Sequence, residues 1–98
     1  MKYEKSTDGK ELTVGLVGEV DAANVADIEE RLLKELPGVT ELVFDLTELE
    51  YISSAGLRVL LQMQKTMKAQ GNMTIKNASD EIMDIFRVTG FIRLLHIV

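Results

Sequence analysis

Two adjacent serines in the middle of the chain are the residues whose type and position could take part in chemistry. Ser53 and Ser54 follow an apolar segment and stand just before Ala55 and Gly56, where a helix is expected to begin. A hydroxyl at a helix start can cap unpaired backbone N–H groups, and the same N–H groups and the helix dipole can accommodate a phosphate. The small residues would let a partner approach, or would let the helix pack closely on a sheet. These uses are compatible and stay open.

Catalytic sites of the common kinds are missing from the sequence. A serine nucleophile needs a base within reach, but the single histidine, His96, lies near the last residue, and the serines lack a Gly-x-Ser-x-Gly elbow. Without cysteine and with one histidine, the usual zinc ligands are lacking, and no glycine-rich phosphate loop with its lysine occurs. We therefore expect no catalytic residue, no metal and no cofactor, and regard a small hydrolase as the unfavoured alternative. His96 is interpreted as a surface or packing residue, and Asp45 as a structural residue because no metal-binding acidic cluster accompanies it.

Hydrophobic periodicity predicts eight elements that must position these serines. Asn24 with Asp27 predicts a capping box for the first helix, and Ser79 predicts the cap of the third. Pro37-Gly38, Gly71 and Gly90 mark the helix ends. The expected strands are Lys2–Ser6 (pairing as a hairpin with the next), Leu12–Gly18, Leu42–Leu46, Met73–Lys76 and Leu94–Val98, and the expected helices are 25–36, Ala55–Ala69 and 80–89.

This alternation predicts an α/β fold with a mostly parallel central sheet and covering helices, built as a single domain over residues 1–98. The nearly continuous apolar run Leu42–Leu46 predicts a central strand covered on both faces. The serines lie in the connection after that strand, and ligand sites of such sheets lie outside the carboxyl ends of the strands.

The amino-acid composition narrows the classes of partner that the protein is expected to bind. The formal charge is -5, from 16 acidic and 11 basic residues, and no basic cluster interrupts it, so a nucleic acid is a poor candidate. The chain begins with polar residues and has no apolar run near the ~20 residues that span a bilayer. We expect a cytoplasmic protein without direct membrane insertion.

Four segments in order resemble the STAS domain, in the branch of bacterial anti-sigma factor antagonists: Gly18–Ala23, Val43–Leu46, Tyr51–Leu57 and Phe86–Phe91. In that branch the third segment commonly reads Asp-Ser-Ser/Thr-Gly-Leu. Its first hydroxyl after the Asp is phosphorylated by a partner that is both anti-sigma factor and serine kinase. Aligned on Gly56-Leu57, the acceptor falls on Ser54, with Ser53 in place of the aspartate and Ala55 in place of the second hydroxyl residue.

The resemblance implies a binding switch. The protein would bind an anti-sigma factor serine kinase, so freeing a sigma factor, and phosphorylation of Ser54 would switch it off; the free protein would be a monomer. The implied partner surface consists of Asp21, Ser53, Ser54, Ala55, Gly56, Leu57 and Arg58. Asp21 is equally suited to a turn. The alternative is an accessory STAS subunit of a membrane transport complex, in which Ser54 stays unmodified.

Overall fold

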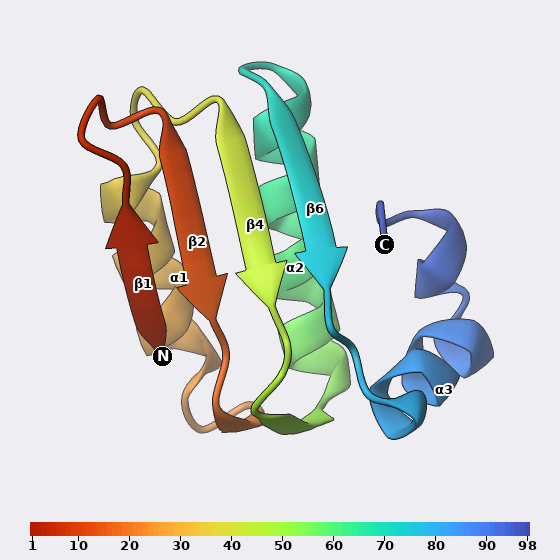
Figure 1. Cartoon of the computed structure of the whole chain (residues 1–98). Helices are drawn as coiled ribbons and strands as arrows, with labels where there is room; N and C mark the ends of the chain where they lie inside the picture. The colour runs from red at the N-terminus through yellow and green to blue at the C-terminus, as the bar shows by residue number, and fades with distance from the viewer.

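Four strands form the central sheet of the computed structural model, which describes residues 1–98 (Figure 1). Its spatial order is β1-β2-β4-β6, with β1 antiparallel to β2 and the other pairs parallel. The predicted hairpin, the central position of β4 and the mostly parallel sheet are confirmed. The strands are β1 (Lys2–Lys5), β2 (Glu11–Gly15), β4 (Glu41–Asp45) and β6 (Asn72–Lys76).

A second, two-stranded sheet was not predicted. β3 (Gly18–Val20) pairs in parallel with β5 (Leu49–Ile52) beyond the carboxyl ends of β2 and β4. The predicted strand Leu12–Gly18 is therefore divided, and Gly18 turns the chain with a φ of 71°, a conformation that favours glycine. Strands of this length carry too few residues to show a period of two.

Helices α1 (Val25–Glu35) and α2 (Ser54–Lys68) lie on one face of the central sheet, and α3 (Asp80–Thr89) lies beyond the β6 edge (Figure 1). The core contains 22 buried apolar residues and no buried polar or charged residue. This core includes Met63 and Met67, which are fully buried.

The opposite face of the central sheet carries no helix in Figure 1. Burial along β4 accordingly alternates: Leu42 and Phe44 are buried against the helices, while Val43 and Asp45 are only half-buried. The prediction of a strand covered on both faces is wrong, because Val43 makes an ordinary one-sided pattern look continuous.

Two of the predicted helix starts had different outcomes. Ser79 caps α3 as predicted, since its Oγ accepts the N–H of Ile82 at 3.2 Å. Asn24 does not cap α1, so the predicted capping box is wrong. Its amide instead faces back along the chain, where Oδ1 accepts the N–H of Asp21 at 3.0 Å and Nδ2 donates to the carbonyl of Glu19 at 2.7 Å.

The predicted last strand Leu94–Val98 is also wrong. Phe91–Arg93 forms a 3₁₀ turn after Gly90, which has a φ of 80°, and this turn continues into bonds from the N–H groups of Leu94 and Leu95 to the carbonyl of Phe91. Those backbone groups are therefore used locally. Only a single bridge, Ile75 to Ile97, reaches β6.

Candidate functional site

The two serines at the start of α2 have different roles. Ser53 is the N-cap: its Oγ accepts the N–H of Gly56 at 3.3 Å, and its own N–H donates to the carbonyl of Val20 on β3 at 2.8 Å. Ser54 is the first residue of α2, is exposed, and makes no side-chain hydrogen bond within the protein. The capping role therefore belongs to Ser53, and the Ser54 hydroxyl is free.

Close packing explains the glycine that follows. A Cβ added at Gly56 would lie 2.6 Å from Cγ1 of Ile52 and 2.8 Å from Cγ1 of Val20. Real Cβ atoms do not approach carbon this closely. Only glycine lets the first turn of α2 rest on β3 and β5, which fixes the position of Ser54.

The loop after β3 is held beside this helix start. Asp21 forms a turn, since its Oδ1 accepts the N–H of Ala23 at 2.9 Å and its carbonyl accepts the N–H of Val25 at 2.9 Å. This observation supports the turn role proposed for Asp21. Because the N–H of Ser53 bonds to the carbonyl of Val20, the residue before Asp21, the Asp21 loop and the start of α2 lie at one end of the molecule.

Only part of the predicted partner surface faces outward. Gly56 and Leu57 are buried, Leu57 with 2% of its surface exposed, and they pack into the core. Ser54 and Arg58 are exposed, while Ala55 is half-buried. Arg58 and Ala55 also line a hollow of about 270 Å³ between α1 and α2, whose other lining residues are Val25, Glu29, Val59 and Gln62.

One exposed aromatic residue beside the site was not singled out from the sequence. Tyr51 on β5 has 48% of its surface exposed and stands three positions before Ser54. Aromatic residues are enriched in protein interfaces. The exposure of Tyr51 depends on which face of β5 its side chain lies on. The sequence does not indicate this, because the strand is short and was not predicted.

Asp45 has the structural role predicted for it. Its Oδ1 accepts hydrogen bonds from Oγ1 of Thr47 at 2.6 Å, from N–H of Thr47 at 3.0 Å and from Nδ2 of Asn77 at 3.1 Å. These bonds, with the Thr47 hydroxyl first, favour the ionised carboxylate and lower the pKa of Asp45. The carboxylate thereby joins the loops that follow β4 and β6.

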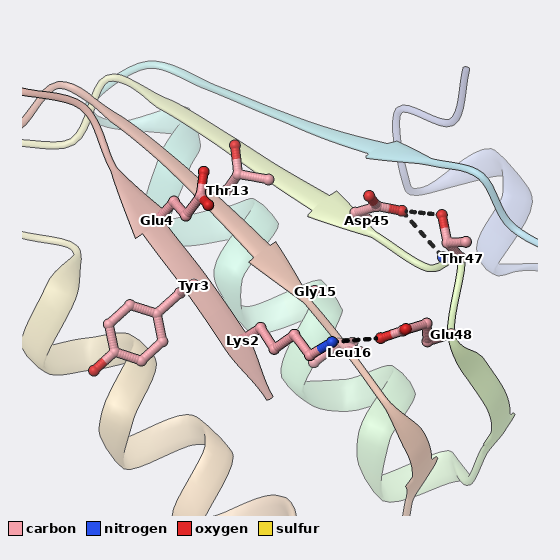
Figure 2. Close-up of a pocket in the computed structure, with 9 residues that line it drawn as sticks. All are labelled: Lys2, Tyr3, Glu4, Thr13, Gly15, Leu16, Asp45, Thr47 and Glu48. Carbon is pink, nitrogen blue, oxygen red and sulfur yellow. Dashed lines mark hydrogen bonds and ion pairs between the residues drawn. The ribbon is translucent and has the colours of Figure 1, made fainter.

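The largest hollow, about 460 Å³, lies elsewhere, on the open face of the central sheet (Figure 2). Figure 2 shows Lys2 bonded to Glu48 at 3.2 Å and Asp45 bonded to Thr47, with Glu4 and Thr13 farther along the sheet. This lining contains no cysteine or histidine, and no group of three potential metal ligands occurs in the structure. The Ser54 end, with its exposed hydroxyl that makes no hydrogen bond, therefore remains the candidate site.

His96 is exposed, in agreement with its interpretation as a surface residue. No helix combines the length and apolar character that a membrane crossing needs.

Comparison with known proteins identifies the family to which the chain is similar. A family model for the STAS domain matches residues 2–98. BtrV of Bordetella bronchiseptica, a candidate anti-sigma factor antagonist by its name, is 35% identical over 81 residues, which cover 81% of this chain and 70% of BtrV. The anti-sigma-B factor antagonist of Listeria monocytogenes is 30% identical over 97 residues, covering 95% of this chain and 83% of that protein.

Solved structures agree in fold. The anti-sigma factor antagonist SpoIIAA in its unphosphorylated form superposes with a TM-score of 0.83 at 20% identity, over 99% of this chain and 86% of SpoIIAA. Bacillus SpoIIAA in its phosphorylated form gives a TM-score of 0.75 at 20% identity, over 99% of this chain and 89% of that chain. Because the family model spans nearly the whole sequence and the relatives match over most of their own length, the chain belongs to the STAS domain family.

Proposed function

We propose that this protein is an anti-sigma factor antagonist, which binds an anti-sigma factor with serine kinase activity and is released when Ser54 is phosphorylated. The observation that carries the proposal is the division of labour between the serines. Ser53 satisfies the helix start, so the exposed Ser54 hydroxyl can be modified without removing the cap. Relatives of the same family bear the name of anti-sigma factor antagonists, which supports the proposed activity.

The phosphoryl transfer must be carried out by the partner. In this step the Ser54 oxygen attacks the γ-phosphorus of ATP, the bond from that phosphorus to the β,γ-bridging oxygen breaks, and ADP leaves. The hydroxyl proton passes to a base. No side chain of this chain is hydrogen bonded to the Ser54 hydroxyl, and the first turn of α2 contains no acidic residue. The kinase therefore supplies the base together with ATP and magnesium.

Charge accounts for the release. A phosphate adds about -1.5 to -2 charges at neutral pH, and a helix N-terminus accommodates it, so the fold of this chain should persist. Across the interface the same phosphate must lose water beside a surface that had matched a neutral hydroxyl, which is costly without a basic pocket. Since about 1.4 kcal/mol changes affinity tenfold, a partial penalty suffices.

The proposed contact surface joins the Asp21 loop to the start of α2 from Ser53 to Arg58. In this proposal residues 1–98 act as one domain in the cytoplasm, as a monomer when free, and catalyse no reaction of their own. Arg58→Glu would weaken partner binding without unfolding the protein, because Arg58 is exposed. Unchanged affinity of this variant would place the interface elsewhere.

The decisive experiment incubates the purified protein with its cognate kinase and ATP, maps the phosphorylated residue by mass spectrometry, and measures partner affinity. Wild type should be modified at Ser54 and released. Ser54→Ala should stay bound, and Ser54→Asp should bind poorly while unfolding near the wild-type temperature. Ser53→Ala is the matched control, because it removes a neighbouring hydroxyl and should still be phosphorylated at Ser54. Normal phosphorylation and release of Ser54→Ala would refute the mechanism.

A further inference from the structure

Arg58 lies on the same face of α2 as Ser54, one turn farther along the helix. The two residues are four positions apart, and both are exposed. Side chains at this spacing are neighbours on a helix surface. Helical side chains also lean toward the N-terminus, so the long side chain of Arg58 extends over the turn that begins with Ser54. A group attached to the Ser54 oxygen would therefore lie within reach of the guanidinium.

The guanidinium of Arg58 has no partner in the unmodified protein. The other two arginines of the α-helices are engaged in ion pairs, Arg31 with Asp27 at 3.2 Å and Arg87 with Asp84 at 3.0 Å. Arg58 forms no ion pair, although Glu29 lines the same hollow between α1 and α2. Its donors are thus available, and no rearrangement of an existing pair is needed to use them.

We propose that Arg58 is the intramolecular counter-ion of phosphorylated Ser54. This inference rests on the proposed function only for the identity of the modified residue. The planar guanidinium can donate two parallel N–H bonds to a phosphate, a geometry that is stronger and more specific than a single point charge provides. Glu29 lines the same hollow as Arg58, and Asp21 lies in the loop after β3, whose last residue bonds to Ser53. Both carboxylates oppose the phosphate, so Arg58 is the cation that we assign to balance it.

The pairing would make one modification change two features of the surface. Before phosphorylation the site presents a neutral hydroxyl and a free positive charge. After phosphorylation the hydroxyl has become a phosphate, and the guanidinium is held against it and withdrawn from any acidic group of the partner. The partner would therefore lose a cation at the same moment as it meets an anion.

A test that needs no kinase uses the full chain with phosphoserine incorporated at position 54 during synthesis. The second ionisation of the phosphate, with a pKa of about 6 in an unstructured peptide, is followed by phosphorus NMR as a function of pH. Arg58→Gln should raise this pKa by about 0.3–0.7 unit relative to the otherwise unchanged phosphorylated protein, because the dianion loses its counter-ion.

Lys65→Gln is the matched control. It removes one exposed positive charge from the same helix, at a position 11 residues from Ser54, or about 16 Å along the axis, where salt screens most of the interaction. It should raise the phosphate pKa by about 0.1 unit or less. Arg58→Lys retains the charge and should keep about half or more of the effect of arginine. Equal titration of the Arg58→Gln and Lys65→Gln proteins would overturn the pairing, as would an Arg58→Lys protein that titrates like Arg58→Gln.

This test separates the two proposals. The phosphoserine is incorporated during synthesis, so the titration does not depend on a kinase. If Arg58→Gln raises the phosphate pKa as expected but the cognate kinase does not phosphorylate Ser54, only the proposed function is contradicted. Efficient phosphorylation and release with no effect of Arg58 on the phosphate pKa would contradict the inference alone. Equal melting temperatures of the unphosphorylated wild-type and Arg58→Gln proteins would confirm that the substitution leaves the fold intact.

Discussion

Replacing Gly56 by alanine should destabilise the protein even though alanine is the better helix former. The added Cβ would lie 2.6 Å from Cγ1 of Ile52 and 2.8 Å from Cγ1 of Val20. Both neighbours are β-branched, at most 3% exposed, and held on the short strands β3 and β5, so neither can rotate away freely. The helix or the strands must therefore move.

The magnitude follows from two opposing effects. Overpacking of a well-packed core costs about 1–3 kcal/mol, and two stiff neighbours favour the upper part of that range. The change from glycine to alanine within a helix returns about 1 kcal/mol. We expect a net loss of about 1–2 kcal/mol, which for a chain of this size lowers Tm by about 5–15 °C.

Thermal and urea unfolding of wild type and Gly56→Ala will measure this loss. A double-mutant cycle with Val20→Ala tests its cause, because that substitution removes one of the two carbons that the new Cβ would meet. The double variant should be more stable than the sum of the single effects by about 0.5 kcal/mol or more. A Gly56→Ala protein as stable as wild type, or additive behaviour in the cycle, would refute the close approach of α2 to the small sheet.

Four further substitutions test other contacts. Ser53→Ala should lower the free energy of unfolding by about 0.5–2 kcal/mol because it removes the cap of α2, whereas Ser54→Ala should change it by less than about 0.5 kcal/mol. Equal effects of the two substitutions in urea unfolding would contradict the roles assigned to the serines. Asp45→Ala should cost about 1–2 kcal/mol at pH 7, because three donors lose their acceptor. Since the folded pKa of Asp45 is lowered, its contribution is present at neutral pH and is lost as the pH falls below about 4, so the stability difference between wild type and this variant should shrink there in a pH series of melting curves. Gly71→Ala should lower Tm by about 8 °C or more, since its Cβ would collide with the backbone carbonyl of Thr40, which cannot rotate away as a side chain can. A Tm within about 2 °C of wild type, which corresponds to about 0.5 kcal/mol or less, would contradict that packing.

Local patterns were sufficient wherever the chemistry of a segment is local. The long helices, the Ser79 cap, the Gly90 end and the N-terminal hairpin depend on neighbours in sequence, and the structure has each of them as predicted. Asn24 shows the limit of such patterns. Its side chain suits a cap, but the carbonyl of Glu19 on β3 offers a competing bond, and only the folded loop brings the two together.

The short segments outside the central sheet depended on tertiary contacts. The strands β3 and β5 form because Val20 and Ile52 pair with each other and pack against the first turn of α2. The predicted last strand is absent because Leu95 enters the core, while the backbone N–H groups of Leu94 and Leu95 bond within the 3₁₀ turn. A run of apolar residues indicates that a segment is buried, but it does not indicate which surface covers that segment.

The candidate site divides in the same way. The amino-acid sequence alone determined that two serines precede a helix, that small residues follow them, and that this segment resembles a known acceptor motif. Which serine caps and which is free, and that Tyr51 faces the solvent, were decided by the tertiary structure. The physical reason is that the residue at which α2 begins, and the direction of each side chain there, depend on backbone far away in sequence, such as the Val20 carbonyl that accepts the N–H of Ser53. That direction exists only once β3, β5 and α2 have packed together.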